Sequence, residues 1–97
     1  MVSDVDDITI EYEEDGQVVV QELDKSILSK GAWTTILFKY RQWENRKDDF
    51  GPVKYTIRRY RKIRNVYRQQ AKFNISSTDQ AQKIAGTLME WIAEDSE

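Results

Sequence analysis

A two-residue alternation of apolar and polar side chains constrains the fold of this chain more than any other feature. Ile8, Ile10 and Tyr12 fall on one side of an extended segment, and polar residues stand between them. This period is that of a half-buried β-strand rather than of a helix. Asp15-Gly16 follows as a strong two-residue turn signal. The sequence therefore predicts an N-terminal hairpin over residues 8–23.

The alternation resumes after a connection at residues 24–32. It predicts strands over residues 33–43, 53–63 and 66–75, which together form a set of basic antiparallel strands over residues 33–75. Turn signals separate these strands, because Gly51-Pro52 lies in a charged loop over residues 44–52 and Arg64-Asn65 marks a tight turn.

A helical period appears only near the C-terminus. Ser77 followed by Gln80 matches a capping box. Beyond it runs an apolar stripe, widened by Trp91: Ala81, Ile84, Ala85, Leu88 and Ile92. The sequence predicts a helix over residues 77–93. Strands followed by one C-terminal helix predict an α+β fold with an antiparallel sheet of about five strands.

The chain has 97 residues, which fits a single domain over residues 1–97. Residues 1–7 are acidic and are expected to form a frayed, solvated end. No apolar stretch is long enough for a membrane helix, and the N-terminus has no signal-peptide core. We therefore expect a cytoplasmic protein without a membrane partner.

The chain has no cysteine and no histidine. Cysteine- or histidine-ligated zinc, thiol nucleophiles and histidine general bases are therefore excluded. The acidic clusters lack the spaced ligands and the glycine turn of a calcium loop. We expect no enzyme activity, no cofactor, no metal and no small-molecule substrate.

The small net charge of −2 hides a strong separation of charge. Residues 39–72 contain twelve basic and three acidic residues, whereas the rest of the chain contains three basic and fourteen acidic ones. The formal charges of the two parts are thus +9 and −11. Such an asymmetry indicates a basic binding face on an acidic body.

Basic and aromatic residues are interleaved along the basic strands. Cations at regular spacing can follow a phosphate backbone, and exposed rings can stack on unpaired bases. A sheet presents such groups over a broad surface, which suits a single strand better than a duplex groove. The candidate nucleic-acid-binding residues are Lys39, Arg41, Trp43, Lys54, Arg58, Tyr60, Arg61, Lys62, Arg68 and Lys72.

Other interpretations of the same residues stay open. Solvated sheet faces commonly carry such side chains without any ligand, and Arg64 and Arg68 could protect a sheet edge from aggregation. The basic face could instead dock an acidic protein partner, and the acidic N-terminus could cover that face in the same molecule. RNA is an alternative to DNA, because both offer unpaired bases.

Residues 33–92 resemble the transcriptional positive cofactor four family, a Whirly-like group of single-stranded DNA-binding proteins, and in particular its bacterial members. Two segments carry this resemblance, Tyr55-Thr56-Ile57-Arg58-Arg59-Tyr60 and Lys72-Phe73-Asn74-Ile75-Ser76-Ser77-Thr78-Asp79-Gln80. Lys30-Gly31-Ala32-Trp33 and Trp43 add to it. The hairpin over residues 8–23 is not part of the family pattern.

The resemblance implies a curved antiparallel sheet, a homodimer formed largely through the helices, and single-stranded DNA bound across the basic strands without strict sequence preference. A role as a transcription or replication accessory would follow. Arg58 matches a backbone-contacting arginine of the family, and Lys72 a basic position before the helix. Arg61 stands where the family often has an aromatic ring, so Tyr60 or Trp43 would have to replace it. The predicted dimer residues are Leu88, Met89, Trp91 and Ile92.

Overall fold

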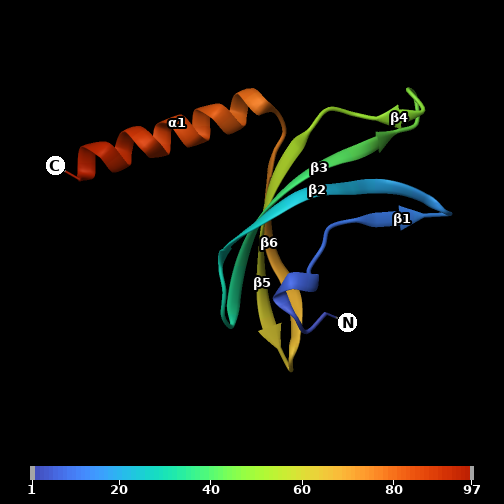
Figure 1. Cartoon of the computed structure of the whole chain (residues 1–97), viewed down its shortest axis with the longest axis horizontal. Helices are drawn as coiled ribbons and strands as arrows, with labels where there is room; N and C mark the ends of the chain where they lie inside the picture. Colours follow the sequence, from blue (N-terminus) through green and yellow to red (C-terminus); the bar gives the residue numbers. More distant parts are fainter. Residues whose placement is uncertain (1, 97) are drawn as a thin grey trace.

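The computed structural model describes residues 2–96 and contains an antiparallel sheet followed by one helix. The strands lie in the order β1-β2-β3-β5-β6, and β4 pairs with β3. Figure 1 shows a strongly twisted sheet from which the helix projects. The predicted α+β class is confirmed. The elements are η1 (Val5–Asp7), β1 (Tyr12–Glu14), β2 (Gln17–Ser29), β3 (Trp33–Glu44), β4 (Asp49–Phe50), β5 (Lys54–Ile63), β6 (Val66–Ile75) and α1 (Thr78–Asp95).

Two hairpin turns of the sheet form at the predicted positions. Asp15 and Gly16 join β1 to β2 and have φ angles of 50° and 80°. Arg64 and Asn65 join β5 to β6 with φ angles of 51° and 66°. Two consecutive positive φ angles match the twist of antiparallel strands in a two-residue turn. Arg64 adopts this backbone conformation without the steric freedom of glycine.

One face of the sheet holds the core, and we call it the covered face. Ile36 and Phe38 of β3 are fully buried there, together with Thr56 of β5. Ile8 and Tyr60 complete the core, and other apolar side chains of the N-terminal segment pack against it. The opposite side, which carries Trp33, Thr35, Leu37 and Lys39 of β3, we call the open face.

The residues before β1, which we call the N-terminal segment (residues 2–11), are ordered against the covered face. The expectation of a frayed end over residues 1–7 was therefore wrong for residues 2–7, whereas Met1 lies outside the described residues. Lys25 Nζ donates hydrogen bonds to the backbone oxygens of Asp6 and Ile8, at 2.7 and 2.6 Å. The backbone N–H of Tyr67 donates to the oxygen of Val2 at 2.9 Å. The segment docks because its valine and isoleucine side chains cover Phe38 and Tyr60, which would otherwise face water.

Two boundaries also differ from the sequence-based expectations. The first strand of the N-terminal hairpin begins only at Tyr12, because residues before it belong to the docked segment. Strand β2 continues to Ser29, through most of the predicted connection at residues 24–32. Register shifts between Glu22 and Asp24 and between Ile27 and Ser29 let this long strand follow the twist of β3.

The helix begins where the capping pattern predicts. The Ser77 hydroxyl accepts a hydrogen bond from the backbone N–H of Gln80 at 3.1 Å, and the Gln80 side chain accepts one from Ser76 N–H. Figure 1 shows α1 leading away from the sheet, and its contacts with other elements are mainly with β6. No helix within residues 2–96 is long and apolar enough to cross a membrane.

Candidate nucleic-acid interface

The strand register divides the ten candidate residues between the two faces of the sheet. Arg58 lies opposite Lys72, whereas Arg61 lies opposite Arg68. Because neighbouring positions along a strand point to opposite faces, the covered face carries Lys54, Arg58, Tyr60, Lys62 and Lys72. The open face carries Lys39, Arg41, Trp43, Arg61 and Arg68.

Arg41 and Trp43 form a separate group at the loop end of β3. The Trp43 ring packs edge-on against Phe50, with 5.2 Å between centroids, and the Arg41 guanidinium lies 5.2 Å from the Phe50 centroid. Arg41 also donates to the Gln21 side chain at 2.8 Å. Trp33, the register partner of Arg61, also lies on β3. Trp43 is ten positions further along this strand, about 33 Å away. The ten residues therefore do not form one cluster.

The β5–β6 hairpin is the most concentrated source of positive charge. Residues 54–72 include eight basic residues and no acidic one: Lys54, Arg58, Arg59, Arg61, Lys62, Arg64, Arg68 and Lys72. We call these eight the hairpin cations. Among residues 2–96 the only ion pair within 4.0 Å joins Lys47 to Glu44. The hairpin cations are thus not neutralised by carboxylates of the described chain.

Two cross-strand pairs of this hairpin join like charges. Arg58 opposes Lys72 on the covered face, and Arg61 opposes Arg68 on the open face. Like charges directly opposite each other on neighbouring strands are destabilising. Neither pair has a carboxylate of the described residues within 4.0 Å. Two such pairs do not favour stability, and local conflicts of this kind are expected at functional sites.

Side chains around Arg58 hold its guanidinium in place on the covered face. Its Nε donates to Thr56 Oγ1 at 3.1 Å, and one terminal nitrogen donates to Gln69 Oε1 at 2.7 Å. Thr56 Oγ1 is itself positioned by a 2.8 Å hydrogen bond to Asn74 Oδ1. Arginine has five N–H donors, so this arrangement fixes the side chain and leaves donors for an anion.

Two arginines of the open face gather around Trp33. The guanidinium carbon of Arg59 lies 4.2 Å from the Trp33 ring centroid, and that of Arg61 lies 5.3 Å from it. Trp33 is 39% exposed, so it offers a partly accessible aromatic side chain beside two cations. Sequence reasoning did not include Arg59 or Trp33 in the site. Only the register of β3 against β5 reveals that they meet.

Tyr60 does not offer its ring to a ligand in this structure. It is only 7% exposed, because Ile8 and Val5 of the N-terminal segment belong to the cluster that covers it. Burial raises the pKa of its hydroxyl above 10.0, an effect that Arg58 opposes and Glu22 reinforces electrostatically. The base-stacking role expected for Tyr60 therefore does not fit the position of its ring in this structure.

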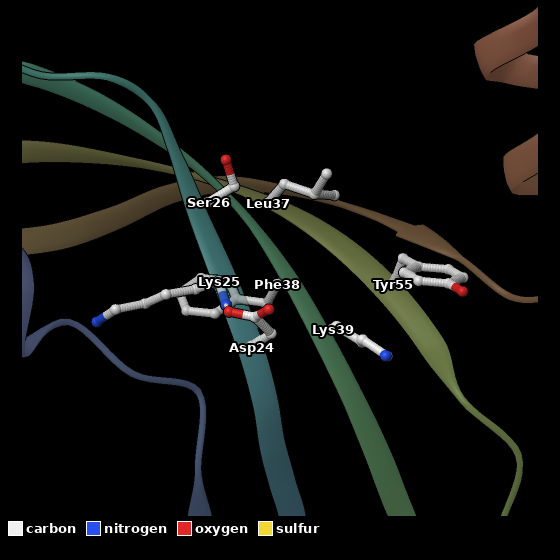
Figure 2. A pocket seen from close by; sticks show the side chains of 7 residues that line it. All are labelled: Asp24, Lys25, Ser26, Leu37, Phe38, Lys39 and Tyr55. Carbon is white, nitrogen blue, oxygen red and sulfur yellow. Dashed lines mark hydrogen bonds between the residues drawn. The ribbon is translucent and has the colours of Figure 1, made fainter.

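A shallow hollow lies between β2 and β3 beside the shift in register after Glu22 (Figure 2). Figure 2 shows Lys25 directed toward the N-terminal segment, whereas Lys39 and Tyr55 lie on the other side of the strands. Its lining combines polar and apolar side chains: Asp24, Lys25, Ser26, Leu37, Phe38, Lys39 and Tyr55. No cluster of three or more potential metal ligands occurs among residues 2–96. Of the ten candidate residues, the hollow includes Lys39.

The four predicted dimer residues lie on the exposed helix α1. Leu88, Met89, Trp91 and Ile92 are between 49% and 71% exposed. The helix has no buried residue at all among those described. Its apolar stripe is therefore unpartnered in the single chain.

Comparisons of the chain with protein-family models, with curated proteins and with solved structures find no match.

Proposed function

We propose that this chain binds single-stranded nucleic acid through the β5–β6 hairpin. The observation that carries the proposal is the set of eight hairpin cations, none of which forms an ion pair within 4.0 Å with a described carboxylate. Four of them form two like-charge cross-strand pairs. A phosphate backbone is the common biological polymer that supplies closely spaced negative charges. Binding it would release counterions and relieve the repulsion within each pair.

Single strands fit this surface better than a duplex. The hairpin cations lie along a sheet rather than on a helix or on a free ribbon that enters a groove. The partly exposed Trp33, with Arg59 and Arg61 close by on β5, provides a ring on which an unpaired base can stack. The resemblance of residues 33–92 to the Whirly-like family of single-stranded DNA-binding proteins supports DNA as the preferred strand, without strict sequence preference, and a role as a transcription or replication accessory.

The acting unit in this proposal is a homodimer that pairs through α1. The helix buries none of its side chains in the single chain, although helices in proteins owe most of their stability to the packing of an amphipathic face. A partner that covers its apolar stripe would supply this packing. Lys83 lies near one end of the helix, and Glu90 and Glu94 lie near the other. In an antiparallel pair, Lys83 of one copy approaches these carboxylates of the other, so the helix is complementary in charge to a second copy of itself.

A second candidate function is the docking of an acidic protein segment. Leu37, Ile57 and Phe73 are register partners across three strands of the open face, and Phe73 is 52% exposed. This apolar row beside the hairpin cations would suit a peptide that combines apolar and acidic residues. Nucleic acid is favoured because the like-charge pairs match closely spaced phosphates.

Fluorescence anisotropy with labelled oligonucleotides tests the first proposal against the second. The probes are a mixed-sequence single-stranded DNA, the same sequence as RNA and as duplex, and an acidic peptide. We expect the single strand to bind more tightly than the duplex, with an affinity that falls steeply as salt rises from about 0.05 to 0.15 M. Binding of the peptide without binding of any nucleic acid would refute the first proposal and support the second.

A further inference from the structure

We infer that a bound single strand passes around the free edge of the sheet at β6 and contacts both faces of the β5–β6 hairpin. This inference rests on the proposed single-strand binding and specifies the path of the strand. Its basis is the presence of one like-charge pair on each face of the same two strands: Arg58 and Lys72 on the covered face, and Arg61 and Arg68 on the open face.

The two pairs are close together along the hairpin. Only two positions of β5 lie between Arg58 and Arg61. A register shift between Arg59 and Tyr60 leaves an additional residue in β6 at this point, Gln70. Such a bulge bends and twists an edge strand. The bulge therefore lies where the surface turns from one face to the other.

The edge between the two pairs is open and polar. β6 is the last strand of the sheet, and every residue from Arg68 to Asn74 is exposed. Gln69 and Gln70 carry amides that can donate to phosphate or base oxygens. The N-terminal segment reaches this edge only at Tyr67, nearer the turn, where Val2 accepts a backbone hydrogen bond. Arg68, Gln69, Gln70 and Lys72 thus form a polar path around the edge, interrupted only by the small Ala71.

Steric access explains why the strand follows this path rather than lying on one face. On the covered face, the N-terminal segment blocks the course beyond Tyr60 toward β3. On the open face, the apolar row of Leu37, Ile57 and Phe73 interrupts the cations. Neither face alone offers a long run of cations, whereas the edge connects the two pairs directly.

Two matched variants test the path, Lys72→Gln for the covered face and Arg68→Gln for the open face. Both side chains are exposed, and each substitution removes one member of a like-charge pair, so we expect both variants to fold. Arg46→Gln, in the loop before β4, removes the same charge elsewhere and serves as the control. Anisotropy is measured with oligothymidylates of about 4 and about 16 nucleotides.

With the longer strand, each hairpin variant should weaken binding about fourfold at 0.15 M salt and lower the salt slope by about 0.7, as expected for one lost phosphate contact. In the double variant, the two factors by which affinity falls should multiply. The control Arg46→Gln should bind with the affinity of the parent. With the shorter strand, each substitution should have a smaller effect than with the longer strand, because a short strand makes fewer contacts with both pairs at the same time. One long strand should bind per chain at saturation.

Sensitivity of the longer strand to only one of the two substitutions would overturn the path while leaving single-strand binding intact. Two long strands bound per chain would overturn it as well, since each face would then act alone. Failure of the parent protein to bind any single strand would instead refute the proposed function itself.

Discussion

Arg58 and Lys72 lie directly opposite each other on β5 and β6, where two positive side chains form a single cross-strand pair. Hydrogen bonds from Arg58 to Thr56 and Gln69 hold one member in place. Such a pair opposes folding and is typical of a surface selected to bind an anion. A substitution that removes the repulsion is therefore expected to raise stability and to weaken binding.

Replacement of Lys72 by glutamate should stabilise the protein and weaken its binding. The new carboxylate would face Arg58, so the free energy of unfolding should rise by about 0.5 kcal/mol. Affinity for a single strand should fall by at least about tenfold, because a phosphate contact is replaced by a repulsion. Urea unfolding and anisotropy measure the two effects. Arg46→Glu makes the same change in charge in the loop before β4, outside the hairpin and the helix; equal effects of both variants on affinity would contradict the role of Lys72.

Replacement of Leu88 by glutamate should separate the proposed dimer. Leu88 lies in the exposed apolar stripe of α1. A glutamate at this position would place a charge without a partner inside the helix–helix contact, which is unfavourable. Sedimentation equilibrium should show a dimer for the parent and a monomer for the variant. Gln82→Glu adds the same charge outside the stripe and should remain dimeric. A parent that is monomeric at concentrations of about 100 μM would contradict the helix pairing, since a stable interface has a dissociation constant far below this.

Neutralisation of the N-terminal acids should tighten single-strand binding. Asp6 and Asp7 lie in η1, on the segment that covers Tyr60 beside the hairpin cations. Asp6→Asn/Asp7→Asn removes two negative charges while Val5 and Ile8 stay to pack on the sheet. Affinity should rise at low salt and the gain should disappear at high salt, because the effect is a screened repulsion. Glu13→Gln/Glu14→Gln removes two charges from the exposed strand β1, at the edge of the sheet opposite β6. If both double variants gain equally, net charge rather than the position of the segment is responsible.

The sequence was sufficient for elements whose signals are local. The strand from Val66 to Ile75 and the helix start at Ser77 agree with the structure, because turn residues and a capping pattern mark them. The docking of Val5 and Ile8 was missed, since it depends on Phe38 and Tyr60, which lie far away in the chain. Alternation within one strand likewise separates two faces without showing which faces of different strands coincide. For this reason the ten candidate residues appeared as one surface, although the register places them on two.

Alkaline pH should destabilise the protein partly through Tyr60. Burial raises the pKa of this hydroxyl in the folded state above 10.0. Below that pH the hydroxyl is protonated in the folded and the unfolded chain, and its contribution to the free energy of unfolding is complete. As pH rises, the hydroxyl ionises first in the unfolded chain. Stability is therefore lost as pH rises toward the folded-state pKa. Urea unfolding of the parent at about pH 8 and about pH 11 should show this loss. Tyr60→Phe should lose less stability over the same interval, whereas Tyr12→Phe, which alters an exposed ring of β1, should lose as much as the parent.

An identical loss in the Tyr60 variant and in the parent would show that Tyr60 ionises as freely in the folded chain as in the unfolded one, and that the N-terminal segment does not keep water from its hydroxyl.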